Sequence, residues 1–215
     1  MVTVFLMEKQ ITALKAQKKN PDRVNVYLDG EFAFGVSRFV GAGLRVGQNL
    51  SPDEISLLDD ADTREKAYQT ALRFIGYKPR TEREVIKRLE SGGYSAEIIC
   101  SVLDELRQKE YINDAEYAAQ WAEIRAHGHP RGRRLIAQEL RSKGVANEII
   151  QNALLILPDE REMAIRLGEA FLNKNKNLED RLFIKKMEGV LARKGFDFGV
   201  IREVVGELIQ LKEKS

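Results

Sequence analysis

The stretch Leu140-Arg-Ser-Lys-Gly144-Val145 has two near-copies, one 51 residues upstream as Leu89-Glu-Ser-Gly-Gly93-Tyr94 and one 51 residues downstream as Leu191-Ala-Arg-Lys-Gly195-Phe196. Glycine readily adopts the left-handed conformation that ends a helix, and the apolar residue after it can fold back onto the last turn. Each copy therefore predicts the C-terminus of a helix. A constant internal period of this kind is typical of repeat architectures.

Apolar residues continue the period on both sides of each stop. One turn upstream, Val85, Ile136 and Met187 correspond. Downstream, an apolar stripe with helical spacing recurs as Ile98, Ile149 and Val200, then Ile99, Ile150 and Ile201, then Leu103, Leu154 and Val205, then Leu106, Leu157 and Leu208. Such spacing predicts an amphipathic helix after each stop. A further apolar helix is expected before each pair, at residues 67–75, 117–125 and 164–172. The fold is thus predicted to be mainly α, with three tandem three-helix repeats.

A β segment is expected before the repeats, at residues 9–37. Two strand-like runs, 24–28 and 32–36, flank Asp29-Gly30, a strong hairpin signal. A two-residue loop would set Val26 opposite Ala33, whereas a three-residue loop would pair Val26 with Phe32. We favour the three-residue loop because it pairs apolar side chains. A lone hairpin is marginal, so a third strand or a helix should support it.

Ser51-Pro-Asp-Glu54 has the pattern of a helix N-terminus, with a capping serine, a proline in the first turn and a glutamate that completes a capping box. The predicted organisation is a β-rich extension at 1–50, an acidic helical joint at 51–66, and repeats at 67–110, 111–157 and 158–215.

The 215 residues carry a net charge of +2, but the charge is uneven. Residues 51–65 sum to −5, residues 124–143 to +5 and residues 181–194 to +4. This distribution favours a partner whose charge pattern matches these segments over attraction through the net charge of the whole protein. The apolar runs are too short for a membrane span, no signal-peptide pattern is present, and a single cysteine fits a reducing compartment. We expect a cytoplasmic protein without membrane contact.

Catalytic and metal-binding patterns are weak. Cys100 lies among apolar residues with no base nearby in sequence, so a buried or half-buried structural thiol is the default. His127 and His129 form a His-Gly-His loop without further ligands. Phosphate-binding loops, zinc-hydrolase helices and nucleophile elbows are absent from the sequence. We expect no enzyme activity, no metal and no cofactor.

Basic residues follow the period more closely. Arg83, Arg134 and Lys185 stand 51 residues apart and about 200° around the helix from the apolar positions, so they should point away from the core. For any single residue, a solvated helix face is an equally good explanation. A cation that recurs with the repeat instead predicts a basic track, which suits a phosphate backbone or an acidic protein groove. Aromatic platforms and base-reading helices are not evident, so sequence-specific readout is not expected.

The middle repeat resembles the RecX family of recombinase regulators. The resemblance rests on Tyr111-Ile-Asn-Asp114-Ala-Glu-Tyr117-Ala118, Trp121, Arg125 and Gly132-x-x-x-Ile136-x-x-Glu139-Leu140-x-x-Lys143-Gly144-Val145. It covers residues 64–210, closest in the middle repeat and weakest in the third. The stretches Gln17-Lys-Lys-Asn20 and Tyr27 to Val36 are similar to the β extension of longer members. The resemblance implies an elongated, curved molecule that binds in the groove of the RecA–single-stranded DNA filament and inhibits strand exchange and the RecA ATPase, in recombinational repair and the SOS response.

Residues of this pattern are assigned two roles. We expect Tyr111, Tyr117, Ala118, Trp121 and Leu140 in the core, Asp114 and Glu139 as caps or repeat–repeat pairs, and Gly93, Gly144 and Gly195 as helix stops. Contact with the filament or DNA is assigned to the basic residues Arg80, Arg83, Lys87, Arg125, Arg131, Arg133, Arg134, Arg141, Lys143, Lys185, Lys186, Arg193 and Lys194. The expected partners are RecA and single-stranded DNA in the RecA filament. The alternative is a general helical DNA-binding protein that binds DNA alone. A monomer is expected.

Overall fold

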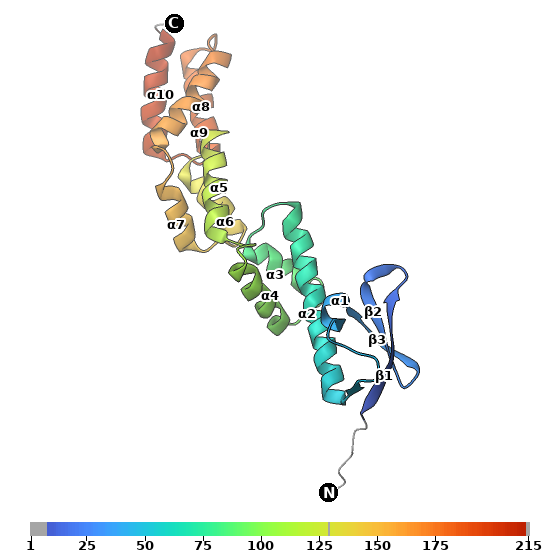
Figure 1. Ribbon diagram of the computed structural model, residues 1–215. Coiled ribbons are helices and arrows are strands. Elements are labelled where there is room, and N and C mark those ends of the chain that lie inside the picture. The colour runs from blue at the N-terminus through green and yellow to red at the C-terminus, as the bar shows by residue number, and fades with distance from the viewer. Residues whose placement is uncertain (1–7, 129, 214–215) are drawn as a thin grey trace. The chain divides into compact units, whose positions relative to one another are not determined.

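The computed structural model describes residues 8–128 and 130–213. These residues form two compact units, one made of 8–78 and 86–109, the other of 79–85 and the described part of 110–213. The first unit contains the β segment and most of the first repeat. The second contains the second and third repeats together with the first turn of one helix of repeat 1. Figure 1 shows the element order along the chain.

The first unit begins with a four-stranded antiparallel sheet of strand order β3-β2-β1-β4. Its elements are β1 (Lys9–Gln17), β2 (Asn20–Leu28), β3 (Glu31–Ser37), the short α1 (Arg38–Gly41) and β4 (Asn49–Leu50). One face of the sheet packs against α1 and the start of the following helix, around the buried Ile11, Val26, Leu28, Val36 and Leu50. The extra strands supply the support that the hairpin was predicted to need.

The hairpin register differs from the prediction. Its loop has two residues, Asp29 and Gly30, with positive φ values of 52° and 91°, which suits a type I′ turn. Tyr27 pairs with Phe32, and the register then shifts so that Val26 lies opposite Phe34. The predicted three-residue loop is therefore wrong. A bulge in β3 allows both the two-residue turn and the pairing of apolar side chains across the strands. A regular ladder with either loop length allows only one of the two.

Helix α2 (Pro52–Tyr77) carries both the acidic segment and the first helix of repeat 1. Ser51 and Glu54 form the predicted capping box at its start. Farther along, the buried Asp62 side chain joins α2 to the sheet. It accepts hydrogen bonds from the Arg23 guanidinium at 2.9 and 3.2 Å and from the Ser37 N–H at 2.7 Å, and it pairs with Lys66 at 2.8 Å. Burial alone would raise the pKa of Asp62, but these bonds outweigh it and hold the pKa below its ordinary value.

The remaining helices complete the three predicted triplets. They are α3 (Glu82–Glu90), α4 (Ala96–Gln108), α5 (Asp114–His127), α6 (Arg133–Ser142), α7 (Asn147–Leu155), α8 (Glu160–Lys174), α9 (Asp180–Arg193) and α10 (Phe198–Glu213). Repeat 1 consists of the C-terminal part of α2 with α3 and α4, repeat 2 of α5–α7 and repeat 3 of α8–α10 (Figure 1). None of the helices within the described ranges is long and apolar enough to cross a bilayer.

The three glycine stops are confirmed. Gly93, Gly144 and Gly195 have φ values of 79°, 86° and 81°. At each stop the N–H of the next residue donates to the leucine carbonyl five positions back, at 3.2 to 3.4 Å, as in a Schellman motif. The apolar residue thus folds back onto the last turn, and Val145 and Phe196 are buried there.

The second and third repeats share one core, in which Ile136, Leu140, Met187 and Leu191 are fully buried. Tyr117 and Trp121 pack against this core and are half-buried. The prediction of a buried Tyr111 is wrong, since 51% of this residue is exposed. Tyr111 precedes the cap of α5, and its neighbour Ile112 takes the buried position instead.

Candidate functional site

The first turns of α3 and α6 lie on the C-terminal stops of α6 and α9, at two joints with the same pattern. At the first joint the Thr81 hydroxyl donates to the Lys143 carbonyl at 2.7 Å, and at the second the Gly132 N–H donates to the Lys194 carbonyl at 2.9 Å. Both the donors and the acceptors are 51 residues apart in sequence. The first turn of one middle helix therefore lies on the C-terminal stop of the next, so that the positive end of one helix dipole faces the negative end of another.

Glycine is required at these joints for space as well as conformation. A Cβ on Gly144 would overlap the aliphatic part of the Arg83 side chain, and one on Gly195 would overlap Leu135. No atom would lie within 4 Å of a Cβ on Gly93, the stop of repeat 1. The joints thus place the start of α3 on the end of α6, and the start of α6 on the end of α9.

The three periodic cations lie beside this line of helices. Arg83, Arg134 and Lys185 belong to the second unit and are exposed, as predicted from the helical spacing. Arg83 and Arg134 are each the second residue of their helix, whereas Lys185 lies in the second turn because α9 begins earlier relative to the period. Among the described residues, none of the three has an acidic partner. Their charges are therefore available to a ligand.

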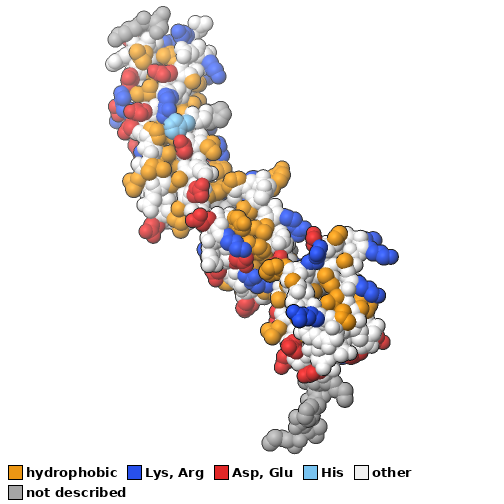
Figure 2. Space-filling model, viewed as in Figure 1, with side chains coloured by type: hydrophobic (Ala, Val, Ile, Leu, Met, Phe, Trp, Pro, Cys, Tyr) orange, Lys and Arg blue, Asp and Glu red, His pale blue; other side chains and the backbone are white. Residues whose placement is uncertain are grey.

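Several other predicted contact residues are instead engaged within the protein. Glu84 lies 3.7 Å from Arg80 and 3.6 Å from Lys143. Glu139 pairs with both Arg125, at 3.0 Å, and Arg131. Basic and acidic side chains are also interspersed on the face seen in Figure 2. Positive charge alone therefore does not define the contact surface.

Glu139 is the centre of a polar cluster between α5 and α6. Its carboxylate accepts hydrogen bonds from the Trp121 indole at 2.9 Å and from the Arg125 guanidinium at 3.0 Å. Arg125 lies 4.3 Å and Lys143 4.7 Å from the Trp121 ring centroid, within cation–π distance. Burial, together with repulsion from Arg125, lowers the pKa of Arg131. This arrangement gives Arg125 and Arg131 a structural role that the prediction did not assign to them.

Arg133 has a second structural role. Its guanidinium donates to the carbonyls of Leu154 at 2.7 Å, Leu157 at 3.2 Å and Pro158 at 3.1 Å. Leu154 lies in the last turn of α7, and Leu157 and Pro158 follow its end, so the guanidinium lies at the negative end of this helix, where a cation is favoured. Arg133 therefore fixes the connection between repeats 2 and 3.

The remaining predicted contacts are accessible to different degrees. Lys87, Arg141, Lys186 and Arg193 are exposed, and Lys194 is half-buried. Arg141 hydrogen-bonds the Asn147 side chain at 3.2 Å. Lys87 belongs to the first unit and the others to the second. In the second unit the exposed subset comprises Arg83, Arg134, Arg141, Lys185, Lys186 and Arg193.

Asp114 makes a repeat–repeat contact, one of the two roles expected for it. Its carboxylate accepts a hydrogen bond from the Glu82 N–H at 2.9 Å, at the first turn of α3. The neighbouring Asn113 caps α5 itself. Two adjacent polar residues therefore cap two helices from different repeats.

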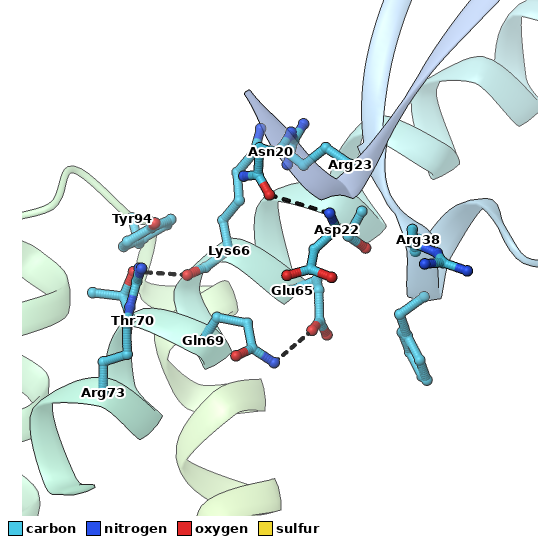
Figure 3. A pocket seen from close by; sticks show the side chains of 12 residues that line it. Asn20, Asp22, Arg23, Arg38, Glu65, Lys66, Gln69, Thr70, Arg73 and Tyr94 are labelled. Atoms are coloured by element: carbon cyan, nitrogen blue, oxygen red, sulfur yellow. Dashed lines mark hydrogen bonds between the residues drawn. The ribbon is translucent and has the colours of Figure 1, made fainter. Parts of the chain in front are cut away.

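A hollow of about 880 Å³ lies in the first unit between the sheet and α2 (Figure 3). Its polar side chains mostly serve the fold: Arg23 and Lys66 pair with Asp62, and Gln69 donates to Glu65. No group of metal-ligating side chains occurs in the described residues. Cys100 is exposed rather than buried. His127 Nδ1 lies 3.0 Å from the Glu123 carbonyl oxygen, and His129 lies outside the described residues.

The N-terminal sheet region and each of the three repeats are similar to parts of known proteins. Four family models match: "Regulatory protein RecX N-terminal domain" at residues 9–51 and the first, second and third three-helix domains of RecX at 67–106, 113–154 and 159–205. Regulatory proteins RecX of Bacillus licheniformis and Bacillus subtilis are 32% and 31% identical, each over 92% of this chain and 76% of the relative. A crystal structure of regulatory protein RecX aligns with a TM-score of 0.75 and 30% identity over 91% of this chain and 98% of that one. RecX from Lactobacillus salivarius aligns with a TM-score of 0.64 and 28% identity, over 70% and 99%.

Proposed function

The chain belongs to the RecX family, and we propose that it is a non-enzymatic inhibitor of the RecA recombinase. In this proposal it binds in the groove of the RecA–single-stranded DNA filament in the cytoplasm and suppresses ATP hydrolysis and strand exchange during recombinational repair and the SOS response. One observation carries the proposal: exposed cations without acidic partners recur on the middle helices, which are joined where a first turn lies on the next stop.

The repeated joints support a ligand that is itself periodic. Because each middle helix begins on the stop of the next, the spacing between Arg83 and Arg134 is set by the packing of the repeats rather than by a mobile loop. A filament offers acidic groups and phosphates at regular intervals. Several individually weak contacts would then add, because each contact raises the effective concentration for the next.

Inhibition requires more than attachment. A ligand shifts a filament between states only when it binds one state more tightly than the other. A monomer that spans neighbouring RecA subunits would favour one filament state and would oppose the movements that accompany ATP hydrolysis.

The five segments predicted from the sequence remain our proposal for how the chain is divided between the sheet, the joint and the three repeats.

The direct test is the RecA ATPase on single-stranded DNA, with and without the protein. We expect hydrolysis to fall as the protein approaches the ratio that coats the filament. An unchanged rate at that ratio, with binding confirmed in the same mixture, would contradict the proposed inhibition.

A general helical DNA-binding protein is the second candidate, supported by the same exposed cations. Salt dependence separates the two. A direct DNA binder should bind naked DNA tightly, with an affinity that falls steeply with salt. The filament proposal instead predicts that the helical repeats bind naked DNA weakly and bind much more tightly once RecA is present.

A further inference from the structure

The N-terminal sheet has one face packed on helices and another that bears a hollow of about 600 Å³. The hollow is lined on β1, the β1–β2 turn, β2 and β3 by Lys15, Lys18, Lys19, Asn25, Tyr27 and Phe32, among others. Strand alternation explains this division, because Val26 and Leu28 point to the core while Asn25 and Tyr27 point the other way.

Two aromatic rings form part of this surface. Tyr27 and Phe32 are cross-strand partners whose ring centroids lie 6.0 Å apart at an interplanar angle of 76°. Phe32 is 59% exposed. The Lys15 ammonium group lies 4.9 Å from the centroid of the Tyr27 ring. The two rings are nearly perpendicular, so the exposed Phe32 ring offers a face for stacking while the half-buried Tyr27 ring packs beside it.

The charge of this surface has one sign. Three lysines line the hollow, and no acidic residue does. Within the described residues these lysines have no ion pair, in contrast to the compensated cations of the second repeat. Beside them the Gln17 amide donates to Asn25 at 2.7 Å, which places two amide groups near the rings. Figure 2 shows basic and hydrophobic side chains next to one another on this module.

We propose that this face of the sheet binds single-stranded nucleic acid. An unpaired base would stack on the exposed Phe32 ring beside Tyr27, and the three lysines would contact the phosphates. A duplex fits less well, because its base faces are already stacked inside the helix. An acidic peptide would use the lysines but would leave the rings without a role. The site lies outside the helical repeats and needs no RecA, so it extends the proposed function rather than depending on it.

The test uses the full-length protein and a fluorescein-labelled oligothymidine of about 20 nucleotides, without RecA, in anisotropy titrations at several salt concentrations. We expect Phe32→Ala to weaken binding about tenfold through loss of base stacking. The double variant Lys18→Ala, Lys19→Ala should lower the slope of log affinity against log salt by about 1.4, because each phosphate contact in a single strand contributes about 0.7. Phe32 is exposed and the lysines lie in a turn, so both variants should unfold thermally like the parent.

Matched controls lie in the third repeat. Phe198→Ala removes a ring that is 66% exposed, and the pair Lys174→Ala, Lys176→Ala removes two exposed lysines. Neither control should change the affinity for the oligonucleotide. If the sheet variants bind with the parent's affinity and salt slope, or if the controls lose as much, the proposal is wrong.

Photocrosslinking of the unaltered protein gives an independent readout. An oligothymidine that carries 5-iododeoxyuridine should crosslink to the peptide containing Tyr27 and Phe32. Crosslinks confined to the helical repeats would overturn the proposal, as would equal displacement of the oligonucleotide by polyglutamate of the same charge. These outcomes concern naked DNA, so they are distinguishable from a failure to inhibit the RecA ATPase.

Discussion

Reversal of the three periodic charges tests the proposed contact surface most sharply. In the variant Arg83→Glu, Arg134→Glu, Lys185→Glu, three exposed cations without acidic partners become anions, so the net charge falls by six. An exposed ionic contact contributes up to about 1 kcal/mol. Three such losses amount to about 3 kcal/mol, or roughly a hundredfold in affinity. Repulsion from the new carboxylates adds to this loss.

The assay is a titration against RecA filaments on single-stranded DNA, read by the RecA ATPase and by direct binding. The concentration for half-maximal inhibition should rise roughly a hundredfold at low salt. If the three cations contact phosphates, the slope of log affinity against log salt should also fall by about 2. Acidic protein groups as the ligand would give the same loss of affinity with a smaller change in slope.

A control with the same change in charge lies on another element. Arg166, Lys174 and Lys176 are exposed and belong to α8 or the loop after it, rather than to a middle helix. Their reversal to Glu should leave inhibition close to that of the parent. Because part of the Arg83 side chain lies against Gly144, urea unfolding must show that the test variant is folded. A folded test variant that inhibits normally, or a control that loses equally, would refute the choice of surface.

Three further predictions concern the scaffold. Glu139→Gln should lower the free energy of unfolding in urea by about 2 kcal/mol, because it leaves two half-buried guanidinium groups without their carboxylate. A loss of affinity for the filament without a loss of stability would instead make this cluster a contact site. Gly93→Ala should lower the free energy of unfolding by about 1 kcal/mol because of the positive φ at this position. Gly144→Ala should lower it by about 2 kcal/mol more because the new Cβ has no space. Equal losses in urea unfolding would show that Gly144 is not closely packed at the joint. The folded-state pKa of Asp62 is depressed, so its contribution is present above the unfolded-state pKa near 3.8 and is lost as pH falls toward the folded-state value. Asp62→Asn should therefore reduce the fall in unfolding free energy as the pH is lowered below 3.8. An unchanged fall would show that another carboxylate causes it.

The repeats could be predicted from the sequence because one physical cause recurs at one period. A helix that ends in a Schellman motif needs glycine at one position and an apolar residue at the next, and both are visible in the sequence at 93, 144 and 195. The outward direction of Arg83 and Arg134 follows from helical spacing alone. Local rules of this kind do not depend on the rest of the fold.

Contacts between elements could not be predicted in the same way. Glu139, on α6, pairs with Arg125 on α5 and with Arg131 in the connection between these helices, at separations in sequence that no helical spacing predicts. The acidic residue was visible, but its partners depend on how the helices pack. Glu84 gave a better signal, because it follows Arg80 by four residues, a spacing at which helical side chains pair.

The hairpin shows a different limit of sequence reasoning. Two local preferences, the two-residue turn at Asp29-Gly30 and apolar cross-strand pairing, exclude each other in a regular ladder. The protein satisfies both by inserting Ala33 as a bulge, and bulges leave no constant residue signature. The exposed face of the same sheet was also missed, because its lysines and rings come from separate strands.

The central claim is that the middle helices direct their exposed cations at the filament, and lysine reactivity tests it most directly. Acetylation of the protein alone and bound to RecA on single-stranded DNA, quantified by mass spectrometry, compares Lys185 and Lys186 with Lys174 and Lys176, all four of which are exposed in the free protein. We predict that bound filament protects Lys185 and Lys186 several-fold and leaves the other two reactive. Protection of Lys174 and Lys176 with full reactivity at Lys185 and Lys186 would contradict the account.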